Sequence, residues 1–549
     1  MKQFVGMVYY VMEFVVQSFL FSLRPFFLFG LVSMWFFAWH PACAQSISFK
    51  QAVAQSASTN PVVFKFYKAH NFQSFWTGDT RADRARFDAL LMAFSNAAVH
   101  GLPAHKFNAN ALLSGLLAAK TGKSLGKFDV SLTIEFLRYA RAVQSGILVP
   151  SAVDEGIVRK VAYQDPSEIL KALKSSSAEM FFRALPPQSM EYARLLKEKK
   201  RLERVVAVGG WGIPVATPTL KVGSKGASVV TLRNRLVGMG YLRRTLSVMY
   251  DVPLENAIRA FQASNGLFVT GIAGTLTIDE INVSASERLM SVLVAMERER
   301  WLNRELGDRH ILVNLTDFTS KVVDFGKVTF ETRSVIGAHD EDRRSPEFSD
   351  MMEHIIVNPS WHVPRSIIIK EYLPMLQEDP EAVDFLELRD DLGIVVDRAD
   401  VDFKSFDEET FPYAMRQPPS AINALGLVKF MFPNRNNIYL HDTPAKKLFD
   451  REVRAFSHGC VRLAKPFKFA YALLEVQTPN PQLVIQAALE FEDEVQIDLL
   501  NPVPVHLIYR TAVTIPGGGL EFRRDIYGRD TKIWEALQVE GVVLNDVTG

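Results

Sequence analysis

The chain has 549 residues, and 48% of them are hydrophobic, so it is long enough to build several hydrophobic cores. The 62 basic and 61 acidic residues nearly cancel, which gives no sign of the basic surface that nucleic-acid-binding proteins carry. With only two cysteines, the chain has no set of disulfides to stabilise it and depends on its cores.

Residues 1–44 are predicted to be an export signal. An apolar stretch, Phe26 to Phe37, follows Arg24 and leads to Pro41-Ala42-Cys43-Ala44, an A-x-A cleavage pattern. We therefore expect cleavage after Ala44 and a periplasmic protein. The alternative is an uncleaved leader that contacts and anchors the chain in the inner membrane, although Glu13 would be costly inside the bilayer.

Residues 45–211 are predicted to form a helical scaffold domain. The clearest helix has an apolar stripe at positions i, i+3, i+4 and i+7, formed by Phe87, Leu90, Leu91 and Phe94. The histidines of this region, His70, His100 and His105, have no carboxylate or cysteine partners at useful spacing. We interpret them as surface or packing residues, and we expect no catalysis here.

Residues 212–284 form a second predicted domain, which begins with a linker rich in Pro and Gly. Its motifs are the apolar repeat Val229, Leu232 and Leu236, then Gly240-Tyr241, Ala257-x-x-x-Phe261-Gln262 and Gly271-Ile272-x-Gly274. Over residues 220–283 it resembles the peptidoglycan-binding domain type 1 family, which implies a small three-helix wall-binding unit. Two positions depart from the family pattern: Thr270 stands where the family usually has Asp, and Arg233 stands where it often has Gln. A purely structural spacer is the alternative interpretation.

Residues 285–549 are predicted to form a mostly-β domain after an initial helix over 286–303. Segments rich in β-branched and aromatic residues indicate strands at 310–318, 321–325, 327–336 and 354–358. A short strand from Ile438 to Pro444 ends in a turn, which places His441 at a strand terminus, where side chains can reach a cleft.

Cys460 is the main candidate for chemistry, and it is the only thiol that remains if the leader is cut. A free thiol has a pKa of about 8.5 and needs a base to become a nucleophile at neutral pH. His441, separated from Cys460 by eighteen residues, supplies an imidazole that titrates in a suitable range. Gly459 lies in a tight turn, where backbone N–H groups can face a developing oxyanion.

Two other interpretations of Cys460 are open. Together with His441 and His458 it could supply three zinc ligands. The absence of C-x-x-C and H-E-x-x-H patterns argues against this, and we predict no metal and no cofactor. The remaining alternative, an inert buried cysteine, conflicts with the specific pattern around it.

The same residues resemble the L,D-transpeptidase catalytic domain. The matching segments are Tyr439-Leu440-His441-Asp442-Thr443-Pro444, Ser457-His458-Gly459-Cys460-Val461-Arg462-Leu463, Asn358-Pro359-Ser360-Trp361-His362-Val363-Pro364 and Asn423-Ala424-Leu425-Gly426-x-x-Lys429-Phe430. The likeness continues from Val505 to Asp530. The layout is similar to that of the large, multidomain, periplasmic members: a multidomain α+β chain with a helical scaffold, a small wall-binding domain and a mostly-β catalytic domain.

The resemblance implies roles for individual residues. Cys460 would be the nucleophile and His441 the base, while His458 and Gly459 would shape the turn and the oxyanion site. The residues that would support the site or contact the substrate are Tyr439, Asp442, Ser457, Arg462 and Trp361.

The resemblance also implies the reaction. Cys460 would form a thioester with one peptidoglycan tetrapeptide stem, the donor, and an amine of a second stem, the acceptor, would convert it to a 3→3 cross-link. Such an enzyme contributes to cell-wall organisation and cell shape, and we expect carbapenems to inhibit it. L,D-carboxypeptidase action and attachment of a protein to the wall use the same acyl-enzyme and are alternatives. The non-enzymatic alternative is a peptidoglycan-binding scaffold without catalysis.

A charged segment, residues 367–417, interrupts the catalytic domain and is predicted to be largely helical. Its acidic residues match no ligand loop, so we interpret them as a solvated helix face; they are Glu371, Glu378, Asp379, Glu381, Glu387, Asp390 and Asp391. By family analogy the segment would be a lid that keeps water from the thioester. Ser420 stands where related sequences often have Gly.

Overall fold

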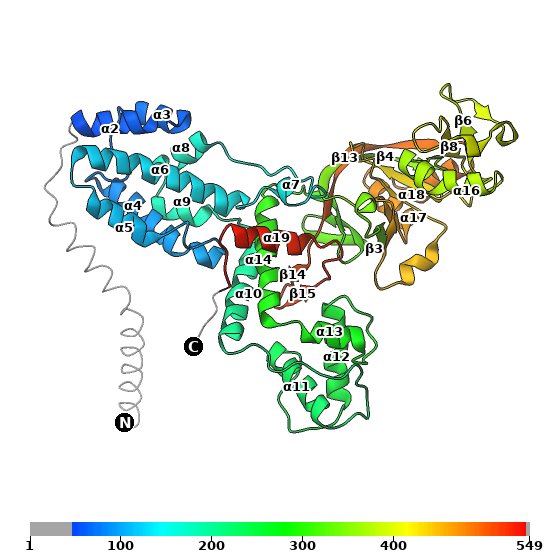
Figure 1. Cartoon of the computed structure of the whole chain (residues 1–549), viewed down its shortest axis with the longest axis horizontal. Helices are drawn as coiled ribbons and strands as arrows, with labels where there is room; N and C mark the ends of the chain where they lie inside the picture. Colours follow the sequence, from blue (N-terminus) through cyan, green and yellow to red (C-terminus); the bar gives the residue numbers. More distant parts are fainter. Residues whose placement is uncertain (1–46, 545–549) are drawn as a thin grey trace. The chain divides into compact units, whose positions relative to one another are not determined.

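The computed structural model describes residues 47–544, and the predicted leader with Cys43 lies outside them (Figure 1). The described residues form two compact units. The first comprises residues 47–95, 108–139 and 164–183, and the second comprises 96–107, 140–163 and 184–544. Within 47–544, no helix has both the length and the apolar character needed to cross a membrane.

The first unit is helical, as the sequence predicted. Its helices are α2 (Ile47–Ala57), α3 (Pro61–Lys68), α4 (Arg81–Ser95), α5 (Ala109–Ala118), α6 (Gly122–Ser145, which runs on into the second unit), α8 (Pro166–Ser175) and α9 (Ala178–Ala184). A buried carboxylate, Asp129 on α6, organises the loop between α3 and α4. It accepts hydrogen bonds from the Tyr67 hydroxyl at 2.6 Å, from the Ser74 hydroxyl at 2.8 Å and from the Trp76 N–H at 3.0 Å. A buried carboxylate is tolerated only when it is satisfied in this way.

In the second unit, two long helices pack side by side against the catalytic domain: α10 (Met190–Ala207) and α14 (Ala285–Trp301) (Figure 1). A capping box starts α14, since the Ser284 hydroxyl accepts from the Glu287 N–H and the Glu287 carboxylate accepts from the Ser284 N–H. The other helices here are η1 (Ala97–His100), α7 (Pro150–Val153) and α19 (Arg529–Val539).

Buried ion pairs join α14 and α19 to the catalytic sheet. Arg298 on α14 donates to Glu347 at 2.7 Å and to Asp530 on α19 at 2.9 Å. Arg529 lies 3.4 Å from the other oxygen of Glu347. These side chains are almost fully buried, so each charge depends on its partners.

The wall-binding-like unit has three helices and its own core: α11 (Ala227–Met239), α12 (Val252–Ser264) and α13 (Thr275–Asn282). Both departures from the family pattern have structural roles. Arg233 is buried and donates to Asp251 at 2.8 Å and to the Met249 carbonyl at 3.0 Å. The Thr270 hydroxyl accepts from Gln262 Nε2 at 3.1 Å and from the Ile272 N–H at 3.1 Å. These contacts hold the turns around α12.

The predicted catalytic domain is built on a nine-stranded sheet, which confirms the mostly-β prediction. The strand order is β11-β3-β12-β10-β9-β4-β13-β1-β2, and β2 also pairs with β3, so the sheet closes on itself. The strands are β1 (Arg309–Asn314), β2 (Thr319–Asp324), β3 (Lys327–Gly337), β4 (Phe348–Val357), β9 (Val428–Met431), β10 (Leu440–His441), β11 (Ala455–Ser457), β12 (Val461–Leu463) and β13 (Val495–Ile508).

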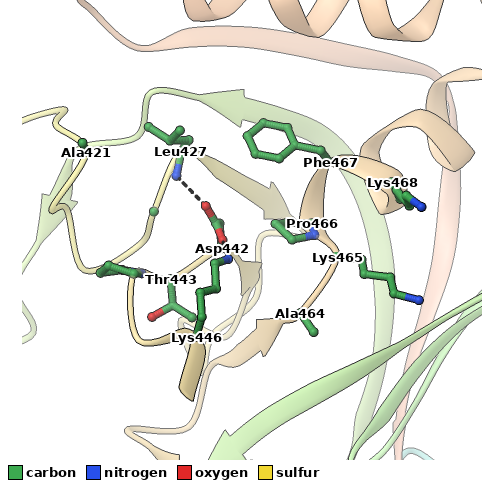
Figure 2. Close-up of a pocket in the computed structure, with 12 residues that line it drawn as sticks. Ala421, Leu427, Asp442, Thr443, Lys446, Ala464, Lys465, Pro466, Phe467 and Lys468 are labelled. Carbon is green, nitrogen blue, oxygen red and sulfur yellow. Dashed lines mark hydrogen bonds and ion pairs between the residues drawn. The ribbon is translucent and has the colours of Figure 1, made fainter. Parts of the chain in front are cut away.

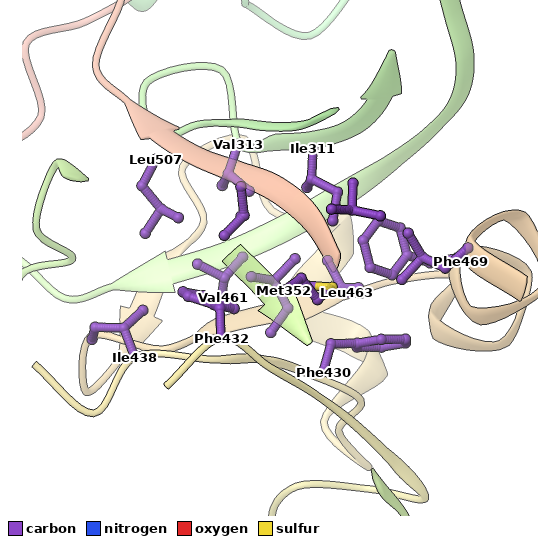
Figure 3. Packing of buried hydrophobic residues seen from close by; sticks show 14 of the residues in the cluster. Ile311, Val313, Met352, Phe430, Phe432, Ile438, Val461, Leu463, Phe469 and Leu507 are labelled. Atoms are coloured by element: carbon purple, nitrogen blue, oxygen red, sulfur yellow. The ribbon is translucent and has the colours of Figure 1, made fainter. Parts of the chain in front are cut away.

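One continuous core fills this sheet and extends beneath two helices, α17 (Pro466–Leu474) and α18 (Pro481–Leu489). Figure 3 shows Val461 and Leu463 of β12 beside Phe430 of β9 and Phe469 of α17. The ring centroids of Phe430 and Phe469 lie 4.8 Å apart. The remaining short elements are η2 (Glu341–Arg343), η6 (Lys446–Asp450) and the pair β14 (Ala512–Thr514) and β15 (Leu520–Phe522).

The predicted insertion is helical in its first part only. That part holds α15 (Arg365–Ile367), the π-helical segment η3 (Ile368–Tyr372) and α16 (Leu373–Glu378). These helices share a core with a four-stranded sheet in the order β5-β8-β6-β7, in which β5 precedes them in the chain and the other strands follow. Its strands are β5 (Trp361–His362), β6 (Glu387–Arg389), β7 (Val395–Val396) and β8 (Ala414–Gln417), with short turns η4 (Arg398–Asp400) and η5 (Phe403–Ser405).

Aspartates explain why the helix stops in the insertion. Asp379, Asp390, Asp397 and Asp402 each accept a hydrogen bond from the backbone N–H two residues further on. This contact stabilises a turn in place of a helix. Of the seven acidic residues that the sequence placed on a helix face, Asp379 and Asp390 therefore form turns, and Glu387 forms an ion pair on a strand.

We expect Glu347→Ala to lower the free energy of unfolding of the second unit by about 3–5 kcal/mol, because Arg298 and Arg529 would keep buried charges without their shared partner. Urea denaturation followed by tryptophan fluorescence measures this. Asp450→Ala is the control, since Asp450 forms an exposed pair with Arg333 and its loss should leave the midpoint unchanged. Equal midpoints for both variants would contradict the importance of the buried network.

Candidate active site

Strand register places five polar side chains on one face of the sheet. Leu440 and His441 of β10 pair in parallel with Val461 and Arg462 of β12, and His441 also lies opposite Lys429 of β9. Directly opposed residues share a face, and faces alternate along a strand. His441, Arg462 and Lys429 therefore lie on the same face. Tyr439, two residues before His441, and Cys460, two residues before Arg462, share that face. Leu440 and Val461 lie on the opposite face, in the core.

The turn that presents Cys460 is held by its own side chains and by glycine. Gly459 has φ of +107°, a region that residues with a Cβ rarely adopt. The Ser457 hydroxyl donates to the Cys460 carbonyl at 2.6 Å. The Val461 N–H donates to the Tyr439 carbonyl at 3.1 Å, which ties the residue after the cysteine to β10. Ser457 and Gly459 thus shape the turn.

The Cys460 thiol is half-buried and uncharged at neutral pH in this state. Its Sγ lies 3.5 Å from the Asn437 carbonyl oxygen. Burial raises the pKa of the Cys460 thiol, while hydrogen bonds from Tyr439 and the positive charges of Lys429 and Arg462 act in the opposite direction. Burial has the larger effect because the thiolate, unlike the thiol, loses hydration when it is buried.

His441 is buried and neutral. Burial, with the nearby charges of Arg462 and Lys429, lowers the pKa of His441 to about 3, although hydrogen bonding to the backbone of Asp442 and Leu425 opposes this shift. Its Nδ1 is buried and has no hydrogen-bond partner among residues 47–544. A neutral imidazole with an unused nitrogen can accept a proton, which is the form that a general base requires.

Tyr439 connects the histidine, the cysteine and the insertion. Its ring lies edge-on to His441, with centroids 5.6 Å apart, and Lys429 Nζ lies 4.1 Å from the ring centroid. Burial, then the charge and hydrogen bond of Cys460, raise the pKa of Tyr439, while a hydrogen bond with Trp361 acts in the opposite direction. Trp361 comes from β5 and packs in the core of the insertion, which also contacts Tyr439.

The side chain of Asp442 is directed away from His441. Its carboxylate accepts from the Leu427 N–H at 3.1 Å and pairs with Lys446 (Figure 2). It lines a cavity of about 470 Å³ at the end of β10, together with Pro466 and Phe467. The backbone of Asp442 hydrogen-bonds to His441 and opposes the lowering of its pKa.

The side chain of His458 contacts the insertion. Its Nε2 donates to Glu371 of η3 at 2.6 Å, and Arg343 donates to the same carboxylate oxygen at 2.5 Å. Glu371, which the sequence assigned to a solvated helix face, thus ties the insertion to the cysteine turn. Across the described part of the chain, no group of three His, Cys, Asp or Glu side chains is placed to hold a metal ion.

The site face carries unbalanced positive charge. In the part of the chain that the structure describes, neither Lys429 nor Arg462 has a carboxylate within 4.0 Å, and Arg462 Nε is buried without a hydrogen-bond partner. Burial lowers the pKa of both groups, and the negative form of Cys460 counteracts it. Lys429 had appeared in the sequence only as one letter of a motif, because its exposure to the site depends on pairing between β9 and β10.

Comparison with known proteins agrees with this geometry. Residues 308–484 match the L,D-transpeptidase catalytic domain family. These residues are therefore similar to an L,D-transpeptidase catalytic domain. Residues 61–198 match a scaffold domain family, and residues 225–281 match a provisionally named peptidoglycan binding domain. Each match lies inside one of the three domains predicted from the sequence, whose boundaries stay predictions.

Individual relatives carry the same domain. A provisionally named L,D-transpeptidase from Haemophilus influenzae is 31% identical over 297 residues, which cover 53% of this chain and 58% of that protein. The aligned region thus spans less than two thirds of the relative's length.

Among solved structures, an L,D-transpeptidase fragment from Xylanimonas cellulosilytica is 14% identical, with 54% of this chain and all of that chain covered and a TM-score of 0.16. An L,D-transpeptidase from Stackebrandtia nassauensis is 17% identical, and the match covers 52% of this chain and 97% of that chain with a TM-score of 0.19. TM-scores this low add no geometric detail.

We expect alkylation of Cys460 by iodoacetamide to speed up about tenfold per pH unit between pH 6 and 8, because the thiolate fraction of a thiol with a raised pKa rises by that factor over this range. Intact-mass spectrometry of timed reactions measures the rate, and Cys460→Ser corrects for any other reactive thiol. A plateau reached near neutral pH would instead indicate a preformed thiolate–imidazolium pair and contradict the neutral state of His441.

Proposed function

We propose that the chain is a peptidoglycan L,D-transpeptidase that forms 3→3 cross-links through a thioester on Cys460. The observation that carries this proposal is the shared face of β9, β10 and β12, where the thiol lies among Tyr439, a neutral His441 and two cations that have no carboxylate partner. The match of residues 308–484 to the L,D-transpeptidase catalytic domain supports peptidoglycan as the substrate.

In the donor step, His441 takes the proton of Cys460 and the sulfur adds to the carbonyl carbon of the third residue of a tetrapeptide stem. The carbonyl electron pair moves to oxygen, where the backbone N–H groups of the turn at Gly459 and Cys460 would stabilise it. The C–N bond then breaks, and the amine of the terminal D-Ala leaves with the proton from His441. The thioester holds the acyl group.

The acceptor step reverses this order. An amine of a second stem attacks the thioester carbonyl and loses a proton to His441, and the C–S bond breaks to return the thiol. Water in place of the amine would give L,D-carboxypeptidase action, and an amine on a protein would give wall attachment. The insertion, held to the cysteine turn through Glu371 and His458, would favour transfer by limiting water.

The two cations explain how a histidine with a pKa of about 3 could act as a base. Burial is the main cause of that low pKa and the charges of Arg462 and Lys429 add to it, so a substrate carboxylate bound beside them would offset their charge and raise the pKa of His441. The terminal carboxylate of the donor stem has the required charge. Substrate binding would thereby turn a weak base into a better one.

We infer that the three-helix unit keeps the enzyme on its polymeric substrate and that the protein acts in the periplasm, with the leader either cleaved or retained as an inner-membrane anchor. The match of residues 225–281 to a peptidoglycan binding domain supports this placement. A non-catalytic wall-binding scaffold is the contrasting function, and it leaves the arrangement around Cys460 without a purpose.

We expect purified residues 45–549 to convert a disaccharide-tetrapeptide into a dimer that has lost one D-Ala, as seen by mass spectrometry. Cys460→Ala should abolish the product, and His441→Ala should slow it about 10²- to 10⁴-fold, the usual contribution of a general base. Tripeptide without dimer would indicate a carboxypeptidase. If neither product forms and no mass adduct with a carbapenem is seen, the acyl-enzyme is ruled out and the non-catalytic wall-binding scaffold is the remaining function.

We expect Arg462→Gln to lower kcat/KM for the stem peptide by about tenfold or more, since a charge-assisted hydrogen bond to a carboxylate is worth about 1.5–3 kcal/mol. Steady-state cross-linking assays measure this. Arg333→Gln is the control, because Arg333 lies on β3 in an exposed pair with Asp450 and should leave the rate unchanged. Unaltered kcat/KM in the Arg462 variant would exclude Arg462 as a substrate contact.

A further inference from the structure

A fully buried serine outside every sequence motif, Ser345, contacts the cysteine turn. It lies in the loop between β3 and β4, and its hydroxyl donates to the Gly459 carbonyl oxygen at 2.6 Å. The same hydroxyl accepts from the Gly337 N–H at 3.0 Å, at the end of β3. This one oxygen therefore connects the carbonyl just before Cys460 to the edge of the catalytic sheet.

The rest of Ser345 is equally constrained. Its N–H donates to the Tyr527 hydroxyl at 3.3 Å, and its carbonyl accepts from Arg529 at 3.0 Å. The Tyr527 hydroxyl in turn donates to the Gly337 carbonyl at 2.6 Å. Gly337 is needed at this point, because a Cβ there would lie 2.6 Å from the Ser345 nitrogen. Every polar group of the serine is thus used, and the residue has little freedom to move.

The geometry of the peptide bond turns this anchoring into a chemical effect. The Gly459 carbonyl and the Cys460 N–H belong to one planar trans peptide, so they point in opposite directions. A hydrogen bond that fixes the carbonyl toward Ser345 also fixes the N–H away from it. Gly459, with φ of +107°, offers little intrinsic resistance to rotation of this peptide. An external contact is needed to hold its orientation.

We propose that Ser345 is a positioning residue that aims the Cys460 N–H at the oxyanion of the tetrahedral intermediate. The inference rests on the proposed acyl-enzyme function and adds a residue to it. Ser345 touches neither substrate nor sulfur; it acts through the Gly459–Cys460 peptide. Removing its hydroxyl would leave the thiol in place and let the oxyanion donor turn away.

Two probes of the same sulfur separate these effects. Iodoacetamide is attacked by the thiolate in a displacement that expels iodide, and no oxyanion forms. The carbapenem meropenem is attacked at its lactam carbonyl: a C–S bond forms, the carbonyl electrons move to oxygen, and the ring C–N bond then breaks as nitrogen takes a proton. Only the second reaction needs the aimed N–H.

The experiment compares wild type, Ser345→Ala and Ser320→Ala by intact-mass kinetics with both reagents. Ser320 is a matched control, since it is also fully buried in the sheet and, among the residues that the structure describes, its hydroxyl bonds only to Ser334, at 2.7 Å. We expect Ser345→Ala to slow meropenem acylation at least about tenfold, in keeping with the usual cost of a misplaced catalytic group. Its iodoacetamide rate should stay within about twofold of wild type, and Ser320→Ala should match wild type with both reagents.

Each other result overturns the inference. Unchanged acylation shows that Ser345 does not aim the N–H, and an equal fall with both reagents shows that it affects the thiol or the fold. If wild type itself reacts with iodoacetamide but not with meropenem, the proposed function fails and this inference fails with it. If Ser345→Ala does not fold, Tyr527→Phe replaces it. That variant keeps the Ser345 hydroxyl but frees its backbone, and it should show the same selective loss of acylation.

Discussion

The pairing of β10 with β9 on one side and β12 on the other is the constraint on which the site depends. Two strands of two and three residues, each too short to be stable alone, are fixed because Leu440 and Val461 are buried in the core beneath them. That burial sets the register. A shift by one residue would turn Cys460 and His441 into the core and bring apolar side chains to the site face.

The same burial sets the electrostatics of the site. Burial removes Cys460 and His441 from water and favours their neutral forms, so the resting site holds a thiol and a neutral imidazole and not a thiolate–imidazolium pair. Within residues 47–544, Lys429 and Arg462 have no carboxylate within 4.0 Å. Such a site is incomplete without an anion, and a stem peptide that brings a carboxylate would change both the charge balance and the basicity of the histidine.

Support for the cysteine turn comes from several distant parts of the second unit. Arg529 of α19 bonds to Ser345, which bonds to Gly459, while its guanidinium also lies against the buried Glu347 that pairs with Arg298 of α14. The helices packed against the sheet therefore contribute to the position of a backbone group beside the nucleophile. On the other side of the turn, the insertion contacts it through its own carboxylate. The turn is braced from two directions.

Sequence alone determined the helical and mostly-β regions, the nucleophile candidate Cys460 and its partner candidate His441, because apolar periodicity, turn residues and a dense local motif are all short-range signals. It could not show that Glu371 meets His458, that Lys429 shares a face with Cys460, or that Ser345 reaches Gly459. These pairs lie 87, 31 and 114 residues apart in the chain. Only tertiary structure decided them, because strand register and the close approach of loops arise from the packing of the whole domain, and no local pattern encodes which distant side chain fills a given contact.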